Sequence, residues 1–104
     1  MITSITRFPL PSGIPTETVK NGFLEVAPRF KHPSGLLRKY FLISEDGKTG
    51  GGVYLWETRE AAEACYQGPW LESVRKIANA DPQIAWFDTT IVVDNESHKI
   101  KIAM

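Results

Sequence analysis

The chain has 104 residues, and its 12 lysines and arginines are balanced by 12 aspartates and glutamates, so its formal net charge at pH 7 is zero. This length predicts one globular domain. The balanced charge gives no electrostatic signal for binding to nucleic acid or to an anionic membrane surface. A single cysteine excludes an internal disulfide and a cysteine-based metal site. No apolar stretch is long enough for a signal peptide or a membrane span, which favours a cytoplasmic protein.

Two strands and a helix are predicted in the first half of the chain. Residues 2–8 place isoleucines among small hydroxyl residues and predict a strand, and the prolines and glycine of residues 9–15 end it. Apolar residues recur on one helical face over residues 16–30, where the hydroxyl of Thr16 is expected to cap the helix. Residues 36–44 are too rich in aromatic and β-branched residues for a surface helix and predict a second strand.

A hairpin and a second helix follow. Gly47, in the sequence EDGK, can adopt positive φ and predicts a tight turn, so residues 51–57 return as an antiparallel third strand. Thr58 is expected to cap the next helix, whose buried side carries alanines and Cys65 as small core residues. Pro69 interrupts this helix because proline lacks the amide and clashes with the preceding turn.

The helix is expected to resume over residues 69–79, and residues 84–94 predict a last, strongly β-branched strand. The tail, residues 95–104, alternates isoleucine with lysine as an edge strand or a partner-contacting strand would. The order β-α-β-β-α-β predicts an α+β, ferredoxin-like fold over residues 1–104. Such a fold has a four-stranded antiparallel sheet with both helices on one face.

The other face of the sheet is open, and an RNA-recognition domain would use it to stack bases. Residues 50–54 lack the basic residue and the paired aromatics that the third strand of such a domain carries. The chain is also neutral. We therefore expect no binding to nucleic acid.

The third strand divides into two sets of side chains. Aliphatic Val53 and Leu55 suit the helix-covered face, which would place Tyr54 and Trp56 on the open face. The glycines of residues 50–52 would permit a bulge or a close approach by a dimer partner or a ligand near these aromatics.

The second strand carries a basic residue in each set, Arg38 and Lys39, and its pattern does not decide which of the two points outward. A buried cation needs a partner or a ligand, so either residue could anchor an anionic or phenolic ligand. A solvated surface position is the more common one for both residue types.

Residues 35–66 also carry a family pattern. Gly35 precedes an apolar strand that contains Lys39, an acidic hairpin follows, and the strand from Gly51 to Trp56 leads into an alanine-rich helix. This pattern resembles the YdhR-like branch of the small dimeric α+β barrel monooxygenases. The resemblance implies a homodimer whose sheets pack face to face, with an apolar cavity between sheet and helices in each subunit. Related barrel enzymes oxygenate electron-rich aromatics without metal or flavin, and there the protein supplies a dry pocket and a proton acceptor.

A second related group of barrel proteins degrades haem with a histidine on the second helix. Residues 33–97 contain no histidine, and His32 and His98 fall in a loop and in the tail. Haem degradation is therefore not expected, and the resemblance implies no cofactor and no metal.

Basic and aromatic residues of the strands and the last helix are the candidates for binding a small apolar or aromatic ligand. They are Arg38, Lys39, Tyr40, Tyr54, Trp56, Trp70 and Trp86. Any of the aromatics could instead be a core residue, and catalytic residues stay undetermined. Two functions remain open. The first is a cofactor-independent monooxygenase that acts on a small aromatic or quinol-like compound, and the second is a non-catalytic homodimeric ligand-binding or structural protein with the same barrel.

Overall fold

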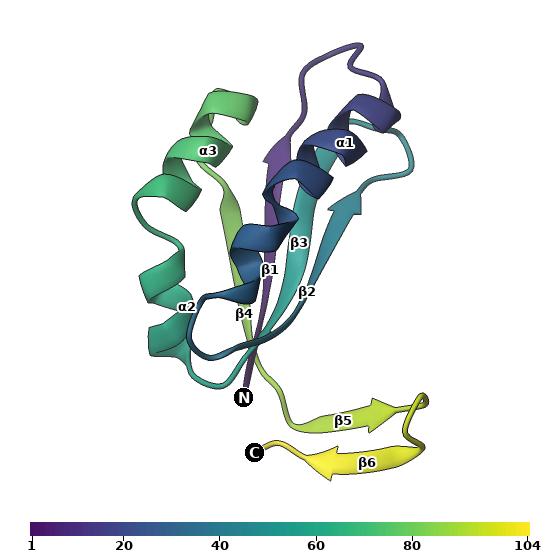
Figure 1. Cartoon of the computed structure of the whole chain (residues 1–104), viewed down its shortest axis with the longest axis vertical. Coiled ribbons are helices and arrows are strands. Elements are labelled where there is room, and N and C mark those ends of the chain that lie inside the picture. The colour runs from purple at the N-terminus through teal and green to yellow at the C-terminus, as the bar shows by residue number, and fades with distance from the viewer.

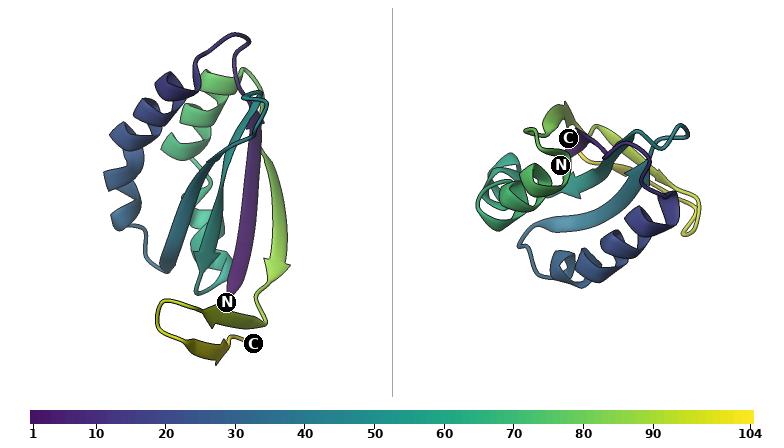
Figure 2. Two further views of the ribbon diagram at one scale, coloured as in Figure 1. Left: turned by 90° about the vertical axis from the view of Figure 1, so that its right-hand side faces the viewer. Right: turned by 90° about the horizontal axis from the view of Figure 1, so that it is seen from above.

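The computed structural model describes all 104 residues and contains a four-stranded antiparallel sheet with the strand order β2-β3-β1-β4. Its elements are β1 (Ile2–Pro9), α1 (Thr16–Val26), the 3-10 helix η1 (Ala27–Lys31), β2 (Leu36–Ile43), β3 (Thr49–Trp56), α2 (Arg59–Cys65), α3 (Pro69–Ala78), β4 (Gln83–Asp88), β5 (Ile91–Asp94) and β6 (Lys99–Ile102). All the helices lie on one face of this sheet (Figures 1 and 2). The predicted ferredoxin-like α+β fold is confirmed. No helix combines the length and the apolar character that crossing a membrane would need.

The predicted capping residue is right for α2 and wrong for α1. At α2, the hydroxyl of Thr58 accepts a hydrogen bond from the backbone amide of Ala61 at 3.2 Å, as a capping residue does. At α1 the N-cap is Pro15, and Thr16 is already helical and makes no capping bond. The carbonyl of Pro15 accepts from the amide of Val19 at 3.3 Å, so the hydrogen-bonding of the helix begins one residue earlier than expected.

Two predicted breaks are confirmed by positive φ angles at glycine. Gly47 has a φ of 74° in the turn between β2 and β3. Gly68 has a φ of 54° between α2 and α3, and Pro69 is the first residue of α3, where a missing amide costs nothing.

The prediction of one strand over residues 84–94 is wrong. β4 ends at Asp88, which pairs with Ile2 at the start of β1, so the main sheet offers no partner beyond it. β5 instead pairs with β6 in a separate two-stranded hairpin below the body of the domain (Figure 1). The tail thus contains a strand, as predicted, but that strand pairs with β5 and does not join the main sheet. Contact of the tail with a partner subunit stays a prediction.

The predicted faces of β3 are reversed. Tyr54 and Trp56 are 1% and 0% exposed and pack beneath α2, where Tyr66 meets both rings edge-on. Val53 and Leu55 therefore point to the open face. Aromatic residues bury more area than valine or leucine, and their polar atoms find partners on the helix-covered side.

Those partners form a buried hydrogen-bonded group. The indole nitrogen of Trp56 donates to the hydroxyl oxygen of Ser4 at 3.1 Å, and the hydroxyl groups of Ser4 and Tyr66 are 2.5 Å apart. Ser4 is completely buried on β1. Because every buried polar side-chain atom has a partner, hydrogen bonds offset the cost of desolvating this group, which fixes the inward orientation of Trp56.

Gly51 and Gly52 in β3 allow the neighbouring strands to approach closely. A Cβ atom at Gly51 would collide with the backbone carbonyl oxygen of Thr6 on β1. A Cβ atom at Gly52 would lie 2.9 Å from the carbonyl oxygen of Tyr40 on β2 and 3.5 Å from Cε of Lys39. The close approach that the glycines permit is thus made by β1 and β2 of the same chain.

We expect Gly51→Ala to lower the free energy of unfolding by about 2–3 kcal/mol, because the added methyl group must displace backbone of β1. Urea unfolding followed by tryptophan fluorescence measures this loss. The matched control is Gly22→Ala on α1, where a Cβ atom has no neighbour within 4 Å and alanine should add roughly 0.5–1 kcal/mol. Equal effects of the two substitutions would contradict the close approach.

Candidate functional site: an apolar pocket with a buried lysine

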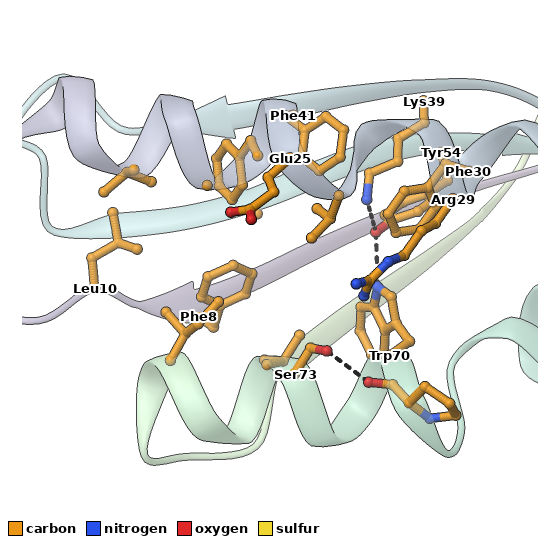
Figure 3. Close-up of a pocket in the computed structure, with 18 of the residues that line it drawn as sticks. Phe8, Leu10, Glu25, Arg29, Phe30, Lys39, Phe41, Tyr54, Trp70 and Ser73 are labelled. Carbon is orange, nitrogen blue, oxygen red and sulfur yellow. Dashed lines mark hydrogen bonds between the residues drawn. The ribbon is translucent and has the colours of Figure 1, made fainter.

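A pocket of about 500 Å³ lies between α1, α3 and the sheet. It is lined mainly by apolar side chains, among them Phe8, Leu10, Val19, Phe23, Val74 and Ile77. Figure 3 shows Phe8 and Leu10 toward one end, with Lys39, Tyr54 and Trp70 grouped at the other. The pocket is on the helix-covered side of the sheet, which is where the resemblance places the cavity.

The side-chain amine of Lys39, a residue of β2, lies in this pocket. Its Nζ donates a hydrogen bond to the hydroxyl oxygen of Tyr54 at 2.7 Å. The same Nζ lies 3.3 Å from the ring centroid of Phe30 and 3.9 Å from that of Phe41. The faces of aromatic rings attract a cation, but they do not accept hydrogen bonds from it as well as water does. The amine therefore has one polar protein partner and is otherwise surrounded by rings.

This environment lowers the pKa of Lys39 from its ordinary value of 10.5 to about 7. The main cause is desolvation, because burial disfavours the charged ammonium. No carboxylate lies within 4 Å of the amine to oppose this effect. Near neutral pH a substantial fraction of Lys39 is thus a neutral amine, which can accept a proton.

Tyr54 occupies the middle of the polar group. Its hydroxyl oxygen accepts from Lys39 and also from the indole nitrogen of Trp70, which is 3.1 Å away. Burial raises the pKa of Tyr54 well above its usual value of 10, so the phenol stays protonated. With both lone pairs of the oxygen engaged, the hydroxyl can take part in a further hydrogen bond only as a donor.

Other titratable groups also line the pocket. Glu25 on α1 and Arg29 on η1 contribute charged side chains, and Cys65 on α2 contributes a half-buried thiol. Burial raises the pKa of the Cys65 thiol, so it is held in its neutral form. The pocket thus combines an apolar body with a neutral hydroxyl, a neutral thiol and a readily deprotonated amine.

The structure brings three of the seven candidate ligand-binding residues together in the pocket, namely Lys39, Tyr54 and Trp70. Arg38 is exposed, and the ring of Tyr40 is 54% exposed on the open face. The remaining two, Trp56 and Trp86, do not line this pocket.

Trp56 is a core residue of the buried group with Ser4. Trp86 is half-buried on β4, and its ring packs near Tyr66 and beneath the guanidinium of Arg59 at 4.3 Å. Both lie on the helix-covered side of the sheet. The expectation that aromatics serve as core residues describes these two, whereas Tyr54 and Trp70 combine packing with a place in the pocket.

The question left open at β2 is decided for Lys39, which faces the helices. A β-bulge between Leu36 and Arg38 shifts the register, so Leu36 and Lys39 share the inner face although they are three positions apart, an offset that in a regular strand places side chains on opposite faces. Phe41 follows two residues later on the same face.

Phe30 and Phe41 were not among the candidates, although both lie over the amine. A signal for Phe30 is present in the sequence, because it ends the apolar face predicted over residues 16–30. A signal for Phe41 is its two-residue spacing from Lys39.

The lowered pKa of Lys39 predicts a pH-dependent stability difference between the wild type and Lys39→Met. Between about pH 7 and pH 10.5 the unfolded chain binds a proton that the folded amine does not, so low pH favours unfolding of the wild type. The stability of the wild type relative to Lys39→Met should rise with pH across this window and stay level below pH 7. Urea unfolding of both proteins at several pH values measures the difference, and a constant difference would contradict a desolvated amine.

Several solved structures share the fold of this chain. It aligns with an antibiotic biosynthesis monooxygenase at 11% identity and a TM-score of 0.67, covering 86% of this chain and 98% of the other. A monooxygenase from the gene ActVA-Orf6 of Streptomyces coelicolor, in complex with nanaomycin D, aligns at 16% identity and a TM-score of 0.65, covering 85% and 86%. SnoaB, a cofactor-independent oxygenase from Streptomyces nogalater, aligns at 21% identity and 0.61, covering 85% and 91%. At these identities the likeness concerns the fold.

Sequence comparison identifies the family. No curated protein matches the chain. A family described as "Putative mono-oxygenase ydhR" matches residues 5–88, which include the whole four-stranded sheet except the first three residues of β1. The chain therefore belongs to the ydhR mono-oxygenase family.

Proposed function

We propose that the chain is a cofactor-independent monooxygenase that oxidises a small aromatic or quinol-like compound in the apolar pocket. The observation that carries the proposal is the position of the Lys39 amine at one end of this pocket. The amine donates a hydrogen bond to Tyr54 and has no carboxylate partner. Family membership supports the reaction class. The fold shared with a cofactor-independent oxygenase and with a nanaomycin D complex supports the kind of substrate.

The chemistry assigned to the chain is proton transfer in an apolar site. A neutral Lys39 accepts a proton from an acidic C–H or O–H of the substrate, and the resulting anion is electron-rich enough to reduce dioxygen. Oxidation of a ring methylene to a carbonyl consumes one dioxygen and releases one water, so no further reductant is required. The hydroxyl of Tyr54, whose oxygen accepts from Lys39 and from Trp70, lies beside the amine, where its own hydrogen could stabilise negative charge on a substrate oxygen.

The experiment that tests this function is oxygen uptake by the purified protein over a panel of anthrones and hydroquinones. Turnover that follows protein concentration, with the oxidised product identified by mass spectrometry, is the expected result. Binding of these compounds without oxygen uptake would favour the alternative of a non-catalytic ligand-binding protein.

We further propose that the protein is a homodimer joined through the open face of the sheet. The strand register places apolar side chains of all four strands on this face, and they are Ile5, Tyr40, Leu42, Val53, Leu55 and Phe87. Tyr40, Leu42 and Phe87 are among the most exposed large apolar residues of the sheet. A contiguous apolar patch of this kind is typical of an interface between protein chains.

Val53→Asp is expected to convert the dimer to a monomer, because a carboxylate placed opposite Ile5 and Tyr40 on the open face would be buried without a partner. The penalty of about 2 kcal/mol or more corresponds to a dissociation constant raised at least about 30-fold. Light scattering at micromolar concentration measures the mass. The control is Leu24→Asp on α1, away from the open face, which should leave the mass unchanged. A monomeric wild type would contradict the dimer.

A further inference from the structure

The amine of Lys39 has the surroundings of a nucleophile as well as those of a base. Its only protein hydrogen-bond partner is the hydroxyl of Tyr54 at 2.7 Å, and the rings of Phe30 and Phe41 cover it within 4 Å. Neither salt bridge of the structure involves Lys39. A lysine whose role was to hold charge in the core would be expected to have an anionic partner.

We propose that Lys39 forms a reversible imine with a lipophilic aldehyde that enters the apolar pocket. The inference goes beyond the oxygenase function and does not depend on it. A desolvated lysine in an apolar pocket is one of the arrangements that activate an amine toward carbonyl compounds.

The step is balanced by groups that are present. The lone pair of Nζ attacks the carbonyl carbon, and a new C–N bond forms as the carbonyl oxygen takes up a proton. Loss of water then gives the C=N bond, and both hydrogens of that water come originally from the amine. The hydroxyl of Tyr54, which is held by Trp70, lies where it can donate a proton to the departing oxygen and recover one from the nitrogen.

The rest of the pocket decides which aldehyde is favoured. Away from the polar group its lining is mainly aliphatic and aromatic, including Leu10, Val19 and Ile77, and its volume is about 500 Å³. An alkyl chain or an aryl group fits this surface, and its binding is favoured because apolar area is removed from water. A polyhydroxylated aldehyde would lose its hydrogen bonds to water there and gain few replacements from this mainly apolar lining.

Octanal is the probe, with sodium cyanoborohydride to reduce the imine irreversibly. At pH 7 and limiting octanal, intact-mass spectrometry is expected to show one adduct per chain, equal to the mass of octanal less one oxygen atom. Peptide mapping should place it on Lys39 with at least about a tenfold preference over any exposed lysine, since an ordinary lysine is almost entirely protonated at this pH. Glyceraldehyde should show no such preference.

Two variants complete the test. Lys39→Arg is expected to lose the preferred adduct, and Lys48→Arg, in the exposed turn between β2 and β3, should retain it. Should Lys39→Arg fail to fold, the distribution of adducts over the seven lysines of the wild type still decides the matter. Octanal adducts spread over exposed lysines, or absent from Lys39, would overturn the proposal. The adduct is measured without oxygen uptake. The result for the imine proposal is therefore independent of the result for the oxygenase function.

Discussion

Lys39→Met is expected to reduce kcat/KM for oxygen uptake by about 10²- to 10⁴-fold, the range typical of losing a positioned proton acceptor. Methionine is similar in length to lysine and suits the surrounding rings of Phe30 and Phe41, so the pocket should keep its shape. Steady-state oxygen consumption with the best substrate of the panel measures the effect. The change removes the amine without adding a charge.

The wild-type pH profile gives an independent readout of the same group. Because the amine must be neutral to accept a proton, kcat/KM should rise with pH through about 7 and then level off. Tyr54 and Cys65 remain protonated across this range, since burial raises the pKa of each. Lys48→Met, at an exposed turn, should keep both the rate and the profile. Activity of Lys39→Met within tenfold of the wild type would exclude Lys39 as the proton acceptor.

Trp56→Ala is expected to lower the free energy of unfolding by about 3–5 kcal/mol, a large part of the 5–15 kcal/mol typical of a domain. The indole is fully buried, stacks on Tyr54 at 5.8 Å and donates a hydrogen bond to Ser4. Its removal leaves a cavity and weakens the buried hydrogen-bonded group. Urea unfolding followed by circular dichroism measures the loss.

The matched control is Trp86→Ala, which removes a half-buried indole from the same side of the sheet. Trp86 has no side-chain hydrogen bond, so its loss should cost less than half as much. An equal loss at both positions would contradict the central place given to Trp56. Because Trp56 does not lie on the open face, its removal should change stability without a selective effect on dimerisation.

The order of the elements was predictable because it rests on local rules. Helical spacing, positive φ at Gly47, the helix break at Pro69 and the capping hydroxyl of Thr58 each depend on a few neighbouring residues. Two errors also have local causes. Pro15 is the N-cap of α1, where Thr16 was expected. The last predicted strand is divided after Asp88, because Asp88 already pairs with Ile2, the first residue of β1.

The site was predictable only in part. Lys39, Tyr54 and Trp70 were all among the candidates, but nothing in the sequence showed that they meet. They come from β2, β3 and α3, and the hydrogen bonds that join them link residues 15 and 16 positions apart. The surface that joins the proposed dimer could not be predicted either, because the spacing of residues in one strand does not show whether that strand contacts a second chain.

By itself, the sequence determined the ferredoxin-like fold and the family, since periodicity, turns and the pattern over residues 35–66 are local properties. Only the tertiary structure decided which face of each strand points inward. A period of two separates Tyr54 from Val53 without saying which is buried, and the bulge after Leu36 changes the phase of β2. The burial of Lys39 among aromatic rings, and with it the chemistry of the pocket, follows from that choice.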